Sequence, residues 1–109
     1  MPLVPTRRAG LAERRLITPE DSQHQNMVLI DADSGAEVEL HPVSNSESFF
    51  ILRGEVEVFG DGWSELLGPG DSCYFPPGME HGARVPAGSA QFLIVFAPCG
   101  VSRAPEPPR

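Results

Sequence analysis

The chain has 109 residues, of which 40% are hydrophobic and 21% charged, a composition typical of one globular domain and not of a disordered chain. Its net charge is −7, it contains no lysine, and half of its arginines lie within the first fifteen residues. The remainder therefore lacks the basic face that a nucleic-acid-binding protein needs. The apolar runs are far shorter than the roughly 20 residues that span a bilayer, so we expect no membrane partner and a cytoplasmic location.

The two ends of the chain differ from its middle. Residues 1–12 contain Pro2, Pro5 and Gly10 without a steady periodicity, which predicts a flexible N-terminal arm. Residues 102–109 contain three prolines and predict an extended or disordered tail. Residues 13–101 are then expected to form a single domain.

Short strand-like runs separated by turn residues follow one another through that domain. They are residues 27–32, 36–40, 48–53, 55–59, 63–67, 72–75 and 90–97. Two of them, 36–40 and 55–59, alternate between apolar and polar side chains, as half-buried strands do. Gly60-Asp61-Gly62 predicts a tight hairpin, because Asp-Gly tolerates the positive φ that such turns require. No run has apolar residues at helical spacing, so the pattern predicts an all-β sandwich or a closed or nearly closed antiparallel barrel.

Glycine, proline, histidine and glutamate recur at fixed spacings in the middle of the chain. Five, five and six residues separate Gly35, His41, Glu47 and Gly54. Five, one and two residues separate Gly70, Pro76, Gly78 and His81. These spacings closely resemble the two motifs of the cupin superfamily, over residues 35 to about 85. The resemblance implies a small antiparallel double-stranded β-helix, the jelly-roll barrel of that family.

The same resemblance implies a metal site inside the barrel. It assigns His41, Glu47 and His81 as ligands of one divalent metal ion. The sequence departs from the family at Val43, where the first motif has a second histidine, and at Val85, where the second motif has asparagine. Three of the family's four protein ligands therefore remain.

Three ligands are enough for several metals. Two imidazoles and one carboxylate suit Fe, Mn, Ni or Zn and leave coordination positions open for a substrate, so the identity of the metal stays open. A buried Glu47 without a partner is costly, and a bound cation explains its presence beside two histidines. Gln23 or His24 is a candidate fourth ligand. The alternative is a site that binds no metal.

Two further residues are candidates for a catalytic role. Arg53 lies at even spacing from Glu47, which predicts the same face of a strand, where it would hold an anionic group near the metal. The alternative places its side chain in solvent at the strand end. Tyr74 is a candidate hydrogen-bond or proton donor, or else a core aromatic residue. Strand alternation predicts that the barrel is lined by Phe49, Ile51, Leu93 and Val95.

Three functions are compatible with these residues. The first is a metal-dependent cupin enzyme of the dioxygenase, isomerase or lyase type, acting on a small oxygen-rich or anionic metabolite in the barrel. The second is a non-catalytic small-molecule binding or sensing protein, with or without metal. The third is a structural barrel filled by its own side chains. The fold does not decide among them, since cupins host many activities.

Two features bear on assembly and redox state. The resemblance implies a homodimer that pairs through an N-terminal strand, for which residues 13–32 have the apolar content. Cys73 and Cys99 match no metal-binding or redox spacing, so we expect reduced thiols.

Overall fold

The structure, a computed structural model, describes residues 4–5, 10–18, 20–22, 24–41 and 45–97, and regular structure in these residues is all β. The strands are β1 (Val4–Pro5), β2 (Leu11–Ile17), β3 (Asn26–Ala32), β4 (Glu37–His41), β5 (Ser46–Arg53), β6 (Val56–Gly60), β7 (Trp63–Leu67), β8 (Ser72–Phe75), β9 (His81–Arg84) and β10 (Ala90–Ala97). Within these residues, no helix is long and apolar enough to cross a membrane.

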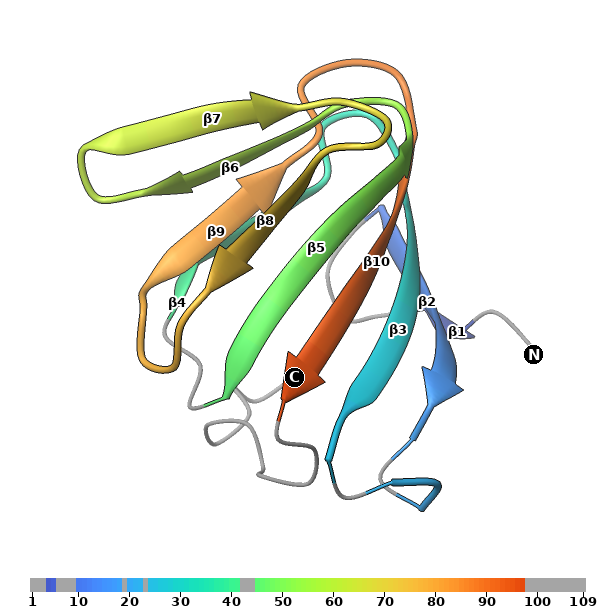
Figure 1. The fold of residues 1–109 in the computed structure, drawn as a ribbon. Coiled ribbons are helices and arrows are strands. Elements are labelled where there is room, and N and C mark those ends of the chain that lie inside the picture. Colours follow the sequence, from blue (N-terminus) through green and yellow to red (C-terminus); the bar gives the residue numbers. More distant parts are fainter. Residues whose placement is uncertain (1–3, 6–9, 19, 23, 42–44, 98–109) are drawn as a thin grey trace.

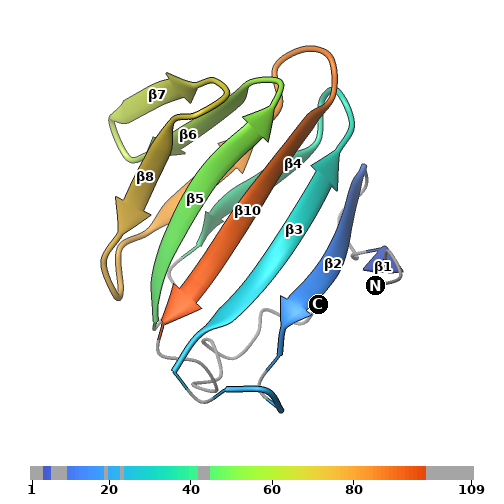
Figure 2. The same cartoon turned by 45° about the vertical axis from the view of Figure 1, so that its right-hand side comes forward.

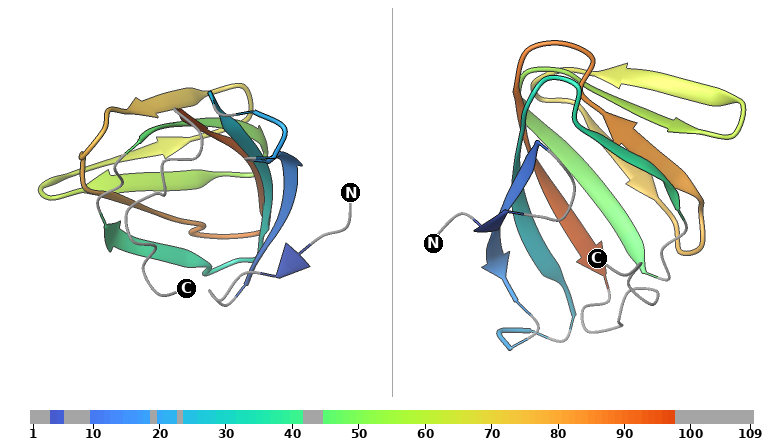
Figure 3. Two further views of the ribbon diagram at one scale, coloured as in Figure 1. Left: turned by 90° about the horizontal axis from the view of Figure 1, so that it is seen from below. Right: turned by 180° about the vertical axis from the view of Figure 1, so that it is seen from behind.

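The strands form two sheets that face each other (Figures 1 and 3). The larger sheet has the order β1-β2-β3-β10-β5-β8, which Figure 2 shows face on. The smaller sheet has the order β4-β9-β6-β7. All neighbouring strands are antiparallel, and β10 returns from the end of the chain to lie between β3 and β5. The predicted jelly-roll fold is confirmed.

Alternation along the strands builds the core between the sheets. Phe92 of β10 lies opposite Ile30 of β3 and Ile51 of β5, and all three side chains are buried. The second sheet contributes Val56 and Val58 from β6. An apolar layer of this kind is the main favourable term for a domain of about 100 residues.

The prediction of which residues of the last strand face inward is wrong. Leu93 and Val95 face outward, because the side chains of β10 that pack against the core are Phe92, Ile94 and Phe96. This strand is apolar on both faces, so alternation does not reveal which face is inside. Phe49 and Ile51 are buried as predicted.

The turns follow the predicted residues closely. The β6–β7 hairpin forms at Asp61-Gly62, with Gly62 at a φ of 81°. Gly54 has a φ of 78°, and a Cβ there would lie 2.1 Å from the carbonyl oxygen of Ser89. Only glycine fits this close approach. At the N-terminus, β2 begins at Leu11, and the predicted tail, residues 102–109, lies outside the described residues.

Candidate metal and acid–base site

Both histidines of the predicted site lie at one end of the smaller sheet. His41 is the last residue of β4 and His81 the first of β9, and the two are direct cross-strand partners. Their ring centroids are 5.5 Å apart. Figure 1 shows β5 beginning at this same end of the molecule, and Glu47 is its second residue. Two sheets therefore bring the three predicted ligands into one region.

Glu47 and His81 are in direct contact across the two sheets. The Oε1 atom of Glu47 lies 2.5 Å from Nε2 of His81. Both residues are almost fully buried, at 5% and 1% exposure. The ring of Phe75 stacks on that of His81 with centroids 3.8 Å apart and planes within 2°. Phe75 therefore fixes the plane in which the imidazole lies.

The contact with Glu47 controls the protonation of His81. Burial works to lower the pKa of His81, but the hydrogen bond and the negative charge of Glu47 outweigh it, and the pKa is raised above 6.5. A charged imidazolium donating from Nε2 to the carboxylate neutralises Glu47 in the protein interior.

The Nδ1 atoms of both histidines contact backbone carbonyl groups. Nδ1 of His41 lies 3.0 Å from the carbonyl oxygen of Glu39, and Nδ1 of His81 lies 3.0 Å from that of Met79. A protonated Nδ1 donates to the carbonyl, which leaves Nε2 as the metal-binding atom. Both rings are thus oriented as metal-binding histidines commonly are.

The chemistry of the donors suits a divalent ion, whereas their positions suit it only in part. In the part of the chain that the structure describes, no group of three or more His, Cys, Asp or Glu side chains is arranged to hold an ion. Two ligands of one metal lie about 3 Å apart, since each bond is about 2 Å long. The direct contact between Glu47 and His81 would have to open to admit an ion between them.

Arg53 does not join this cluster. It lies six residues from Glu47 on β5, about 20 Å away at the opposite end of the strand. Its guanidinium is bound to Ser89 at 2.9 Å and to Asp31 at 3.6 Å, on the outer face. The register between β5 and β10 shifts here, because Ile51 and Arg53 pair with consecutive residues of β10 and one residue of β5 is extra. This irregularity turns Arg53 away from the face that Glu47 occupies.

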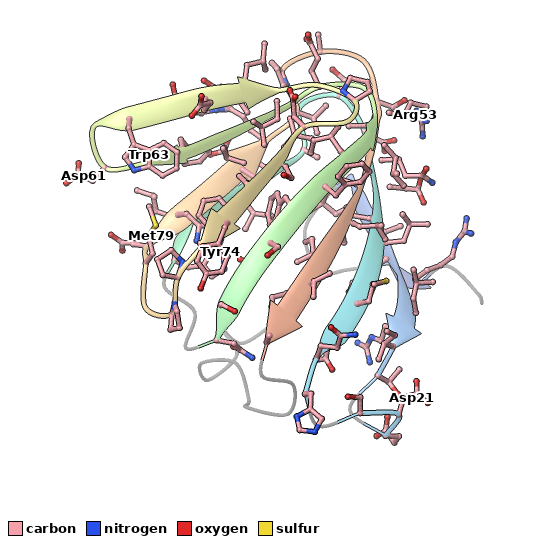
Figure 4. The ribbon with its side chains drawn as sticks, in the orientation of Figure 1. Asp21, Arg53, Asp61, Trp63, Tyr74 and Met79 are labelled. Carbon is pink, nitrogen blue, oxygen red and sulfur yellow. The ribbon has the colours of Figure 1, made fainter. Side chains whose placement is uncertain are left out.

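Tyr74 also lies away from the pair. It is 61% exposed on β8, between the inward-facing Cys73 and Phe75, so it is not a core aromatic residue, and it lines a concave surface beside this strand. Its role as a hydrogen-bond or proton donor stays a prediction. Figure 4 shows Tyr74 on the side of the molecule away from Arg53.

The remaining predicted positions are easily placed. His24 is exposed in the turn before β3, with its amide bound to Ser22. Val85 is buried in the core. Gln23 and Val43 lie outside the described residues.

Sequence reasoning missed two buried asparagines near Glu47. Asn45 is fully buried two residues before Glu47, and even spacing was a usable signal for it. Asn26 is buried on β3, and Phe96 lies opposite both Asn26 and Glu47 in the register. Nothing local in the sequence marks Asn26.

Known proteins match the fold closely. No curated protein matches the sequence. A solved RmlC-like cupin from Shewanella frigidimarina is 28% identical with a TM-score of 0.80, and the match covers 92% of this chain and 86% of that one. The polyketide cyclase RemF from Streptomyces resistomycificus is 20% identical, with a TM-score of 0.79 and coverage of 88% and 72%.

A third solved structure is that of an enzyme with a longer chain. The DMSP lyase DddQ from Ruegeria pomeroyi is 27% identical, with a TM-score of 0.73, and the match covers 81% of this chain and 47% of that one. The family model for the cupin domain matches residues 26–96. That match spans well over half of the sequence, and the chain therefore belongs to the cupin domain family.

Proposed function

We propose that this cupin binds one divalent metal ion through His41, Glu47 and His81 and acts on a small oxygen-rich molecule held in the barrel. The observation that carries the proposal is the orientation of the two imidazoles, each held through Nδ1 by a backbone carbonyl so that Nε2 is the metal-binding atom. A bound ion would supply Lewis-acid polarisation of a substrate oxygen.

The buried carboxylate supports the same proposal. Glu47 needs a cation in the protein interior, and His81 supplies one when it is protonated. A bound metal ion would supply this positive charge in place of the proton. Glu47 and both histidines would then be its ligands. The proposed substrate is oxygen-rich and not specifically anionic, because Arg53 is committed to Asp31 and Ser89 at the far end of β5.

A catalytic role is supported by enzymes among the similar structures, a polyketide cyclase and a DMSP lyase. The second candidate is a metal-free barrel that binds a small molecule without catalysis. The direct Glu47–His81 contact favours it, because the carboxylate is already neutralised without a metal.

Calorimetric titration of chelator-treated protein with Mn²⁺, Ni²⁺ and Zn²⁺ distinguishes the two candidates. The proposal predicts one site per chain for at least one of these ions and its loss in His41→Ala. His24→Ala is the matched control, since it removes the exposed histidine outside the cluster. Binding unaffected by His41→Ala, or no binding of any ion, would leave the metal-free barrel.

We also propose that two chains associate through the outer face of the larger sheet. The predicted N-terminal segment is already used within the chain, where β2 pairs with β3. On the outer face Phe50, 42% exposed, lies opposite Leu93, and Leu93 lies opposite Leu29. Phe50 is exposed and the two leucines are half-buried, and contiguous apolar surface of this kind favours an interface.

Analytical ultracentrifugation tests the association. The expected mass is twice the chain mass of 11.8 kDa, falling to the monomer in Phe50→Glu. Leu66→Glu, which alters an exposed leucine on the other sheet, should remain dimeric. A monomeric wild-type protein at micromolar concentration would contradict the proposal.

A further inference from the structure

A groove opens where the two sheets are not joined, between the edge strands β7 and β8. Its volume is about 460 Å³, within the range of about 300–1,000 Å³ that small-molecule sites occupy. None of the three proposed metal ligands lines it. Trp63 and Met79 both line the groove, and Figure 4 shows Trp63 on the β6–β7 hairpin with Met79 below it in that view. The groove is therefore a concave surface that does not include the proposed metal ligands.

The face of β7 that looks into the groove carries Trp63, Glu65 and Leu67 at alternating positions. Trp63 lies opposite Gly60 in the hairpin register, and a Cβ on Gly60 would lie 2.1 Å from Nε1 of the indole. The indole therefore lies directly over Gly60, in space that only glycine leaves free. Its ring centroid is 6.5 Å from that of Phe75, and the residue is 36% exposed.

The groove combines the exposed indole of Trp63 with negative charge. Glu65 is exposed, and its side chain has no hydrogen bond or ion pair with another described residue. On the opposite wall, the pKa of the Cys73 thiol is raised to about 11, by burial first and also by the charges of Glu47 and Glu65. The groove therefore disfavours anions at its wall and offers Glu65 to a cation.

We propose that this groove binds a small organic cation, with its apolar body against Trp63 and its ammonium group facing Glu65. An indole face and a carboxylate together recognise an organic ammonium, through cation–π attraction and an ion pair. The neighbouring thioether of Met79 adds soft apolar contact. Binding in the groove needs no metal, so this inference stands or falls independently of the function proposed above.

Trp63 is the only tryptophan in the chain, so its fluorescence reports directly on the groove. Phenethylammonium and 3-phenylpropionate serve as probes, since they share an aromatic ring on a short chain and carry opposite charges. We expect a saturable change in Trp63 emission with the cation and at least about tenfold weaker binding of the anion. Equal affinities, or no saturable change with the cation, would overturn the proposal.

A charge-neutralising variant tests the assigned contact. Glu65→Gln should weaken phenethylammonium binding about threefold to fivefold, the range expected for an exposed ion pair. Glu55→Gln removes the same charge from an exposed position outside the groove and should change the affinity less than about twofold. Unchanged affinity in Glu65→Gln, or an equal loss in both variants, would refute the role given to Glu65.

Discussion

Replacing Glu47 with glutamine removes the negative charge from the buried pair that joins the two sheets and changes its shape little. In the metal-free protein, the carboxylate keeps the pKa of His81 above 6.5 against the opposing effect of burial. In Glu47→Gln the negative charge is lost and a neutral amide oxygen replaces the carboxylate as acceptor, while burial, the largest effect on this histidine, remains. The pKa of His81 should therefore fall in the variant.

The stability effect depends on pH with a definite sign. A histidine whose folded-state pKa is raised stabilises the fold fully below its unfolded pKa, and this contribution is lost as pH rises through the folded pKa. A buried hydrogen bond to a charged group contributes about 1.5–3 kcal/mol. At pH 5.5 we expect Glu47→Gln to lose about 2 kcal/mol, which lowers Tm by about 10 °C for a domain this size. The difference should shrink at alkaline pH.

Histidine ring signals in NMR measure the pKa directly. The chain has three histidines, so the ring signals can be assigned to individual residues. Thermal unfolding of both proteins between pH 5.5 and 9 supplies the stability difference. The reasoning is refuted if His81 of the wild-type protein titrates below 6.5, or if Glu47→Gln leaves its midpoint unchanged.

The remaining predictions concern a thiol, two glycines and an arginine. In Cys99→Ser protein, Cys73 should react with iodoacetamide at pH 8 at least about tenfold more slowly than free cysteine, since its pKa is about 11; equal rates would contradict this. Gly54→Ala should lower Tm by more than about 10 °C, because the added Cβ would clash with the backbone of Ser89. Gly35 has a similar φ but open space around it, so Gly35→Ala should reduce the stability by only about 1–2 kcal/mol, a Tm decrease of about 5–10 °C. Equal losses would show that φ alone matters. Arg53→Ala should change stability by less than about 1 kcal/mol and leave metal titrations unchanged, and lost metal binding would contradict its placement away from the proposed ligands.

Local patterns were sufficient for much of the fold. The runs 63–67, 72–75 and 90–97 match β7, β8 and β10 residue for residue, because glycine and proline turns bound them closely. β9 was missed: its four residues, His81–Arg84, contain glycine and no β-branched side chain. Pairing with β4 and β6 makes this segment a strand, and that information is not local.

The candidate site was predicted in composition more than in geometry. Motif spacing identified Glu47 and His81, which the structure places in contact. Alternation failed for Arg53, because the register shift beside Phe92 reverses the face of one strand end. The stacking of Phe75 on His81 joins residues by tertiary packing alone, and the sequence carries no signal for it.

Elemental analysis by plasma mass spectrometry tests the central claim most directly. The protein would be purified without a histidine tag or chelator, beside His41→Ala and the control His24→Ala. The account predicts near-stoichiometric Fe, Mn, Ni or Zn in the wild-type protein and in His24→Ala, and its loss in His41→Ala. No metal in any of the three proteins, even after reconstitution, would contradict the proposed site and leave a metal-free binding barrel.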